Sequence, residues 1–336
     1  LLQAECFFQN DINPISLKIN GAIFGLIFSL LINPTFIQTF MPKPDFIIIG
    51  AMKSATSTLH EQLALQPGFF MSTPKEPNFF SDDGIYNLGF EWYSNLFLKA
   101  ETGDLCGESS THYTKLPDYP LTLKRMQAYL PSLKLIYVVR HPIDRLISHY
   151  MHQWSQNVIK TDINQAIDQF DELINYSRYS MQIAPFIDQY GAENIHIVFS
   201  EALRVRPQYE LEKVATFLGY NNPVIWYDDL PEQNVSSQRV RRFNGYKLIV
   251  DNPILAWIRR KFIPQSLRDK VKNRLTLKMR PEIDELHKQK LTRIFNEDLA
   301  LLGQMLNVEL TLQNYKEKAQ TLDVRLTSNK STMGMS

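Results

Sequence analysis

The sequence predicts an α/β fold with a central parallel sheet, and three apolar runs carry that prediction. Asp45–Ile49, Leu133–Val139 and Asn194–Ser200 are short and almost wholly apolar, as strands buried on both faces of a parallel sheet are. Strands that alternate with helices favour a parallel sheet with right-handed crossovers. The expected helices are Ser57–Gln66, Leu121–Tyr129, Ile143–Trp154, Ser177–Tyr190, Gln208–Leu218 and Glu282–Met305.

The helices are justified by apolar spacing and by their first residues. Leu59 and Leu63 lie four residues apart, on one face of the helix that follows the first strand. The second strand ends at Arg140, and Pro142 stands where a proline opens a helix. The helix after it carries apolar and aromatic residues at helical spacing.

Length and charge limit the choice of domains and partners. A chain of 336 residues is long enough for one large α/β domain or two small ones. The net charge is only +1, but Arg239–Arg293 holds sixteen Lys/Arg against five Asp/Glu. Two interpretations stay open: this third of the chain meets an anionic partner, or its charges are solvated helix faces.

Cysteine and histidine argue against structural metal and disulfides. The two cysteines, Cys6 and Cys106, are widely separated, and the seven histidines show no paired spacing. We therefore expect no metal. Low cysteine usage also fits a reducing compartment, so a cytoplasmic location is expected.

The amino-terminal segment leaves three interpretations open. Gly21–Ile32 is uncharged, but its twelve residues fall short of the ~20 that span a bilayer. It is a signal or membrane anchor within residues 21–40, or residues 1–40 are an upstream extension and the native protein starts at Met41. We expect a single domain over residues 41–312 and a flexible tail over 313–336.

The turn after the first strand has the chemistry of a phosphate site. Backbone N–H groups and the helix dipole at a strand–turn–helix junction bind anions, and Lys53 adds a full charge. No GK[ST] follows, so the turn suits one phosphate without metal rather than a nucleoside triphosphate. The alternative is an ordinary turn with a surface lysine. Small residues fill the turn: Gly50, Ala51, Ser54, Ala55, Thr56, Ser57 and Thr58.

A second phosphate site is predicted at the end of the second strand. Arg140 stands at the carboxyl end of that strand, where open α/β sheets bind ligands. Ser148 lies two turns into the next helix and would face the same pocket. An arginine with a serine hydroxyl suits a phosphate. The alternative is that Arg140 forms a local pair with Asp144.

Several segments together resemble the sulfotransferases that use 3′-phosphoadenosine 5′-phosphosulfate (PAPS). "PDFIIIGAMKSATSTL" (44–59) is similar to their 5′-phosphosulfate loop, and "YVVRHPIDRLISHY" (137–150) to their 3′-phosphate element. The resemblance covers about residues 44–306. The other similar segments, in the family's order, are STPKEPNFFSDD, GFEWYSNLF, GESSTHY, NVSSQRVRRF and LTRIFNEDLALLGQML.

The resemblance implies a fold, an activity and a class of acceptor. The fold would be P-loop-NTPase-like, three layers of α/β/α around the parallel sheet. The activity would be sulfuryl transfer from PAPS without metal. The K-E-x-x-F-F segment at Lys75–Phe80 is similar to that of the carbohydrate, heparan-sulfate-like branch, and a bacterial-type member is expected. A sugar hydroxyl or amine, on a carbohydrate or glycolipid, would be the acceptor.

The resemblance also implies site residues. Glu76 would be the general base, Lys53 would stabilise the leaving phosphate, and Lys75 would contact the sulfuryl group or the acceptor. Beside Phe79 and Phe80, the pKa of Glu76 is expected to be raised; otherwise Glu76 is a solvated loop carboxylate. The donor-binding residues would be Lys53, Ser54, Ala55, Thr56, Ser57, Thr58, Arg140, Ser148, Arg239 and Arg241.

The sequence departs from the family pattern in its first loop, and other functions stay open. Ala55 replaces a glycine of the family loop, and alanine tolerates a positive φ less well. His112 would take part in catalysis or only donate hydrogen bonds. A lipid or small-molecule alcohol as acceptor, a nucleotide kinase and a non-catalytic nucleotide-binding protein stay open. Nucleic-acid binding is disfavoured because aromatic residues are sparse among the arginines.

The segment Ile254–Pro264 has apolar residues around the basic triplet Arg259, Arg260 and Lys261. It would contact a membrane surface peripherally, close the donor site, or attract an anionic glycan. Our hypothesis is that it lies beside the acceptor cleft and favours an anionic or membrane-borne sugar. The oligomeric state is not predicted.

Overall fold

The fold is a parallel sheet with helices on both faces. The computed structural model describes residues 41–230, 265, 280–323 and 325–326. Its five-stranded sheet has the order β2-β3-β1-β4-β5, and every pairing is parallel. This confirms the predicted parallel α/β fold. The strands are β1 (Phe46–Gly50), β2 (Phe69–Met71), β3 (Leu105–Ser109), β4 (Lys134–Val139) and β5 (Ile195–Phe199).

Strand β1 lies in the centre and is buried throughout. Phe46 pairs with Gly107 of β3 on one side and with Lys134 of β4 on the other. The connection after β1 leads toward β2, and the connection after β4 leads to β5 on the opposite side. The chain therefore changes direction between β1 and β4, and open α/β sheets bind ligands at such a switch point.

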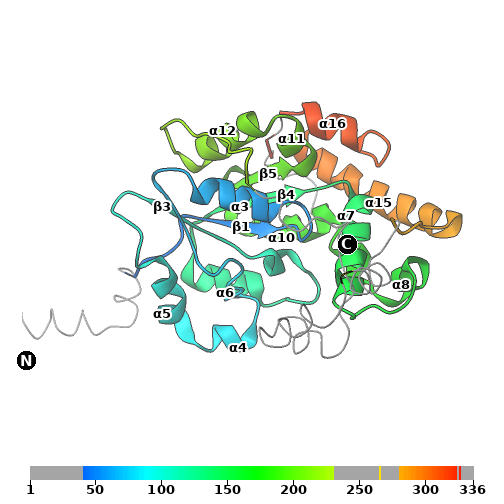
Figure 1. Cartoon of the computed structure of the whole chain (residues 1–336), viewed down its shortest axis with the longest axis horizontal. Helices are drawn as coiled ribbons and strands as arrows, with labels where there is room; N and C mark the ends of the chain where they lie inside the picture. Colours follow the sequence, from blue (N-terminus) through cyan, green and yellow to red (C-terminus); the bar gives the residue numbers. More distant parts are fainter. Residues whose placement is uncertain (1–40, 231–264, 266–279, 324, 327–336) are drawn as a thin grey trace, which may run out of the picture. The chain divides into compact units, whose positions relative to one another are not determined.

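Alternate residues of the strands face two different layers. Phe46, Ile48 and Val138 pack with helices α3 (Thr56–Ala64) and α12 (Pro207–Leu218) in one buried apolar cluster. On the other face, the Tyr137 ring meets Tyr179 of α10. Figure 1 shows α3 and α12 on one side of the sheet and α6 and α10 on the other. The remaining helices are α4 (Asp83–Tyr86), α5 (Gly89–Ser94), α6 (Thr122–Tyr129), α7 (Pro142–Ser155), α8 (Ile163–Gln169), α9 (Glu172–Asn175), α10 (Tyr179–Tyr190), α11 (Ser200–Val205), α15 (Glu285–Leu306) and α16 (Tyr315–Thr321), with 3₁₀ turns η1 (Asn95–Phe97), η2 (Thr111–Thr114) and η3 (Ala192–Asn194).

Two strands were not predicted. β2 has only three residues, and β3 reads LCGES, with a charged residue near its end. Neither offers an apolar run or an alternation over four to eight residues. The pairing of β3 with β1, the pairing of β2 with β3 and the burial of Glu108 are tertiary effects, which the local pattern does not contain.

Part of the segment 313–336, which was predicted to be a flexible tail, is a helix that packs on the domain. Residues Tyr315–Thr321 form helix α16, and Tyr315 and Ala319 are fully buried. The Tyr315 ring packs edge-on against His141 and Phe199. The prediction was wrong for this segment because two apolar residues spaced four apart were too few to reveal a docked helix.

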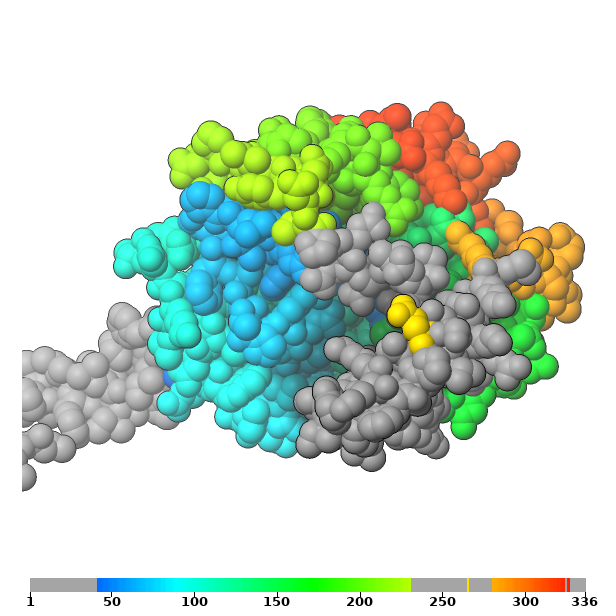
Figure 2. Space-filling model, in the orientation of Figure 1, coloured from blue at the N-terminus to red at the C-terminus, as the bar shows by residue number. Residues whose placement is uncertain are grey.

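Gln62 of α3 and Gln66, which lies just after this helix, hold the chain that follows α12 by hydrogen bonds. The side chain of Gln62 bonds both the N–H and the carbonyl of Tyr227, at 3.0 and 2.7 Å. Gln66 does the same for Ile225, at 2.9 and 2.8 Å. Figure 2 shows the yellow-green end of this segment against the blue residues of the first helix. Among the helices that the structure describes, none is long and apolar enough to cross a bilayer.

Candidate active site

The turn after β1 depends on Gly50. Its φ is +156°, and a Cβ at this position would lie 1.9 Å from Thr114 Oγ1. Thr114 in turn donates to the carbonyl oxygen of Ile49 at 2.8 Å. The 3₁₀ turn η2 therefore crosses the end of β1 so closely that only glycine fits.

Two non-glycine residues of this loop adopt the left-handed conformation. Lys53 has a φ of 70° and Ala55 a φ of 71°. For an L-residue this conformation costs roughly 1–2 kcal/mol. Ala55 is the residue just before helix α3, and it adopts the conformation that glycine would tolerate better. Backbone strain of this kind clusters at binding sites, which agrees with a ligand-binding loop.

The remaining loop residues divide by exposure. Ser54 and Thr56 are buried, whereas Lys53, Ala55, Ser57 and Thr58 are partly exposed. Ser54 Oγ has no hydrogen-bond partner within the described ranges. The loop thus places a lysine, unused hydroxyl capacity and the amino end of a nine-residue helix together, which is the donor set of an anion site.

Arg140 connects the two predicted phosphate elements. Its Nη1 donates to the carbonyl oxygen of Lys53 at 3.2 Å. Its backbone is held by Tyr179, whose hydroxyl accepts from Arg140 N–H at 3.2 Å and donates to Arg140 O at 2.6 Å. Burial, followed by the nearby Arg204, lowers the pKa of the Arg140 guanidinium. The structure therefore brings Lys53 and Arg140 together at the switch point of the sheet.

The alternative, a local pair between Arg140 and Asp144, is wrong, because the carboxylate of Asp144 pairs with other cations. Asp144 forms ion pairs with Arg280 and, at 2.8 Å, with Lys316. Burial alone would raise its pKa, but these two partners lower it to about 2. Arg140 remains available to a ligand, and Ser148 lies buried in the same helix, α7.

Glu76 lies in a strained loop that is bonded to the end of β3. Its φ is 58°, and that of Asn78 is 53°. Glu76 N–H donates to Ser109 O at 2.9 Å, and Asn78 N–H donates to Ser110 Oγ at 3.0 Å. The carboxylate accepts from Lys75 Nζ at 2.9 Å and from Thr111 Oγ1 at 3.3 Å, both on Oε1.

The expected raised pKa of Glu76 is wrong. Burial alone would raise the pKa of Glu76, but Lys75, Lys115 and His112 together lower it below its ordinary value. The two phenylalanines of the K-E-x-x-F-F segment are fully buried, and they pack against the Tyr93 ring in an aromatic cluster.

His112 is less suited to proton transfer than its position in the sequence suggested. Its ring stacks on Tyr119 at 4.9 Å. Burial first, and then Lys115, lowers the pKa of His112 to about 4, so the imidazole is neutral near pH 7. A hydrogen-bonding role fits this environment.

Glu108 is a fully buried carboxyl that the sequence did not single out. It accepts hydrogen bonds from Tyr93 and Tyr113, each at 2.9 Å, and from Ser110 Oγ at 2.7 Å. Burial raises the pKa of Glu108 to about 7. The same Ser110 hydroxyl accepts from Asn78 N–H, so this network supports the loop that carries Glu76.

Arg145 is a second buried charge that was missed. It is fully buried in α7, where Nε donates to Ser177 Oγ and Nη2 to Leu173 O at 2.7 Å. Burial lowers its pKa only to about 10, so it stays charged. A charged residue in an amphipathic helix is ordinarily assigned to solvent, and no local signal marked this one as buried.

Two predicted donor-binding residues, Arg239 and Arg241, lie outside the described residues. The basic triplet Arg259, Arg260 and Lys261 and the segment 21–40 do so too. Among the described residues, no group of His, Cys, Asp and Glu could hold a metal ion.

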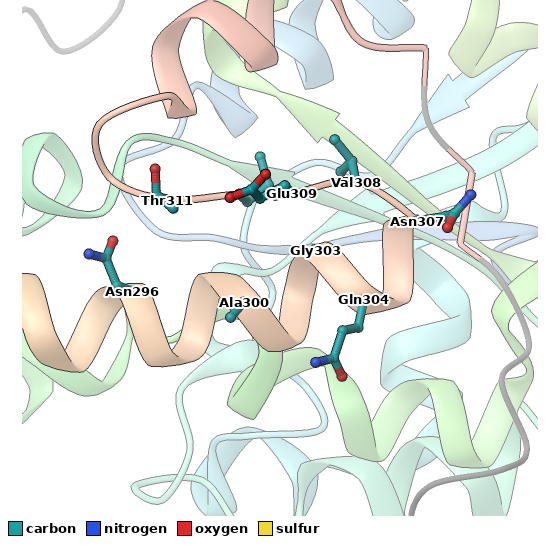
Figure 3. Close-up of a pocket in the computed structure, with 9 residues that line it drawn as sticks. Asn296, Ala300, Gly303, Gln304, Asn307, Val308, Glu309 and Thr311 are labelled. Atoms are coloured by element: carbon teal, nitrogen blue, oxygen red, sulfur yellow. The ribbon is translucent and has the colours of Figure 1, made fainter.

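A cavity of about 460 Å³ lies at the carboxyl end of α15 but is not the predicted site. Figure 3 shows α15 and the chain after it facing each other across this cavity. A Cβ on Gly303 would lie 2.4 Å from Val308 O, so glycine permits their close approach. Among its described lining residues, Glu309 carries the one charge, which does not suit an anionic nucleotide. They are Asn296, Ala300, Gly303, Gln304, Asn307, Val308, Glu309, Leu310 and Thr311.

The comparison with protein families agrees with this geometry. The family profile described as the sulfotransferase domain matches residues 43–295, which is most of the chain. The chain belongs to the sulfotransferase family. Its enzymatic class is therefore that of transferases of sulfur-containing groups, and the resemblance found in the sequence is confirmed.

Curated relatives of this sulfotransferase are similar to part of the chain. Human bifunctional heparan sulfate N-deacetylase/N-sulfotransferase 2 is 27% identical over 197 residues, which cover 52% of this chain and 22% of that protein. Mouse heparan sulfate glucosamine 3-O-sulfotransferase 3B1 is 29% identical over 185 residues, covering 52% of this chain and 46% of that protein. The match thus spans less than half the length of either relative.

A solved structure supports the fold of this sulfotransferase. The crystal structure of a sulfotransferase from Alicyclobacillus acidocaldarius superimposes with a TM-score of 0.56 and 22% identity, covering 80% of this chain and 97% of that one. This likeness shows the three-layer, P-loop-like α/β fold.

Proposed function

We propose that this sulfotransferase moves a sulfuryl group from PAPS to a hydroxyl or amine of a carbohydrate-type acceptor. The observation that carries the proposal is the contact between Arg140 and the Lys53 carbonyl. This contact joins two elements for which we propose anion binding, at one switch point of the sheet, and a donor with phosphates at both its 3′ and 5′ positions would need two such elements.

On the donor side, two elements divide the phosphates. Lys53 and the N–H groups of the loop would bind the 5′-phosphate and stabilise the charge it gains as the leaving group. Arg140 and Ser148 would bind the 3′-phosphate, which ATP lacks. This division explains why the loop needs no second glycine, no GK[ST] and no magnesium-binding hydroxyl.

On the acceptor side, Glu76 would take the proton. Its lowered pKa keeps the carboxylate ionised near pH 7. Within the described part of the chain, the side-chain hydrogen bonds that Glu76 accepts both end on Oε1, so we assign proton acceptance to Oε2. In the step, the acceptor oxygen or nitrogen bonds to sulfur, the bond from sulfur to the phosphate oxygen breaks, and its electron pair leaves with the phosphate.

A carbohydrate acceptor is supported by the relatives, whose names describe sulfotransferases of heparan sulfate. The alternative acceptor is a lipid or small-molecule alcohol. An anionic or membrane-borne sugar, a peripheral membrane contact and a cytoplasmic location stay predictions.

A transfer assay tests the proposal. The purified chain would be incubated with PAPS labelled in the sulfuryl group and with oligosaccharides, glycolipids and phenols, with and without EDTA. We expect label on a carbohydrate in both conditions. Magnesium-dependent phosphoryl transfer from ATP, or binding of PAPS without transfer to any acceptor, would contradict the proposal.

Glu76→Gln sharpens the test. Loss of a general base should lower kcat by about 10²–10⁴-fold while the Kd for the donor changes little. The control is Glu91→Gln, which alters an exposed carboxylate of α5. Full turnover in the Glu76 variant would remove this residue from the mechanism.

A further inference from the structure

Lys115 follows a 3₁₀ turn that is bonded to both halves of the proposed site. At one end of η2, Thr111 Oγ1 donates to the carboxylate of Glu76 at 3.3 Å. At its other end, Thr114 Oγ1 donates to Ile49 O, immediately before the phosphate loop, at 2.8 Å. Lys115 is the next residue, so its backbone is placed between the base and the loop of Lys53.

The backbone around Lys115 is held firmly. Lys115 O accepts from Asp118 N–H at 2.9 Å and from Tyr119 N–H at 3.2 Å. The amide of Gln182, in α10, bonds both the N–H and the carbonyl of Leu116, each at 2.8 Å. The lysine therefore projects from a fixed position.

The side chain of Lys115 is buried, and in the described part of the chain no carboxylate lies close enough to form an ion pair with it. Only 7% of the residue is exposed. Its Nζ lies 5.6 Å from the centre of the Tyr176 ring, on which the ring of His149 also stacks. Within residues 41–230, 265, 280–323 and 325–326, no hydrogen bond or salt bridge of its ammonium is found.

A buried cation without a partner costs several kcal/mol of desolvation, which a fold seldom retains without use. Lys75 differs, because its ammonium already pairs with Glu76 at 2.9 Å. Burial lowers the pKa of Lys115 to about 8, with Glu76 as the main opposing influence, so the ammonium stays largely protonated at pH 7.

We propose that Lys115 is a catalytic residue that donates hydrogen bonds to the non-bridging oxygens of the donor's sulfuryl group. The inference rests on the proposed function, since it assigns a further contact in the same site. Lys115 keeps its proton throughout. The acceptor's proton goes to Glu76, and the electron pair of the broken S–O bond goes to the phosphate beside Lys53.

A comparison of two nucleotides measures the contact between Lys115 and the sulfuryl group. PAPS and 3′-phosphoadenosine 5′-phosphate (PAP) differ only by the sulfuryl group, so calorimetric titration of both measures its binding. Lys115→Met should weaken PAPS by about 10- to 100-fold, as expected for lost hydrogen bonds to a charged group, and leave PAP within about twofold. Lys115→Arg should restore part of the PAPS affinity. Lys99→Met, which alters an exposed lysine, is the control.

Each result decides the inference. A selective loss of PAPS affinity together with a lower kcat supports it. Equal losses for both nucleotides with a lower Tm would show a structural role, and a rise in acceptor KM alone would show an acceptor contact. Either overturns the inference. If the unaltered protein binds neither nucleotide, the proposed function itself fails, whereas normal transfer with an unchanged PAPS-to-PAP ratio in Lys115→Met removes only Lys115.

Discussion

Glu108 at the end of β3 and Arg145 in α7 are both fully buried ionisable side chains, and neither forms a salt bridge within the described residues. Glu108 accepts from three hydroxyls, and its pKa of about 7 lets it take up a proton. Arg145 stays charged, and its Nη1 has no partner in the described part of the chain. The carboxyl is satisfied within the fold, whereas the guanidinium keeps its charge.

The difference shows which side of the proposed site keeps a positive charge that an anionic ligand can neutralise. The hydroxyls around Glu108 satisfy its carboxyl group. One of them, from Ser110, also accepts a hydrogen bond from the loop that carries Glu76. In contrast, Arg145 lies one helix turn from Ser148 and near Arg140, and it adds to the positive potential where the 3′-phosphate would bind. We call the β1–α3 loop and the start of α7 the phosphate side, and the end of β3 the base side.

The largest expected effect tests the base side. The raised pKa of Glu108 makes the folded state bind more protons than the unfolded state between pH 4.5 and 7. Its stabilisation is therefore complete below pH 4.5 and is lost as pH rises through 7. Glu108→Gln should remove this trend, so its free energy of unfolding relative to wild type should rise by about 3 kcal/mol from pH 4.5 to 8.

Denaturant unfolding across this pH range measures the trend. Tyr93→Phe is the control, because it removes one hydrogen bond but keeps the titrating carboxyl, and it should retain the slope. A constant difference between Glu108→Gln and wild type at all pH values would mean that Glu108 does not titrate in this range.

The next effect tests the phosphate side. Arg140→Ala should weaken PAP by about 2 kcal/mol, the loss of a charge-assisted contact with a phosphate. The affinity for adenosine 5′-phosphosulfate, which lacks the 3′-phosphate, should change much less. Binding titrations compare both nucleotides, with Arg204→Ala as a neighbouring exposed arginine control. Equal losses for the two nucleotides would contradict the assignment of Arg140 to the 3′-phosphate.

The smallest effect concerns strain on the phosphate side. Ala55→Gly should raise the free energy of unfolding by about 0.5–1 kcal/mol, because relief of the left-handed alanine exceeds the extra entropy of unfolded glycine. Ala64→Gly, in the helical last residue of α3, should lower it instead. Chemical denaturation measures both. If Ala55→Gly is destabilising, the loop is not strained at this position.

The sequence alone determined the elements that depend on local pattern. β1, β4 and β5 were predicted because strands buried on both faces are continuous apolar runs. Lys53 and Arg140 were predicted as site residues because helix amino ends bind anions and the carboxyl ends of strands in an open α/β sheet bind ligands. The structure then placed these two residues in contact, as their positions at neighbouring strand ends required.

Only the tertiary structure determined which charged groups lie near Glu76. Its pKa depends on Lys75 next to it in the chain, but also on His112 and Lys115, which η2 brings back to it from far along the sequence. Glu108 became a buried carboxyl because Tyr93, Tyr113 and Ser110 converge on it. Electrostatic energies depend on distance and burial in three dimensions, and neither quantity is encoded in spacing along the chain.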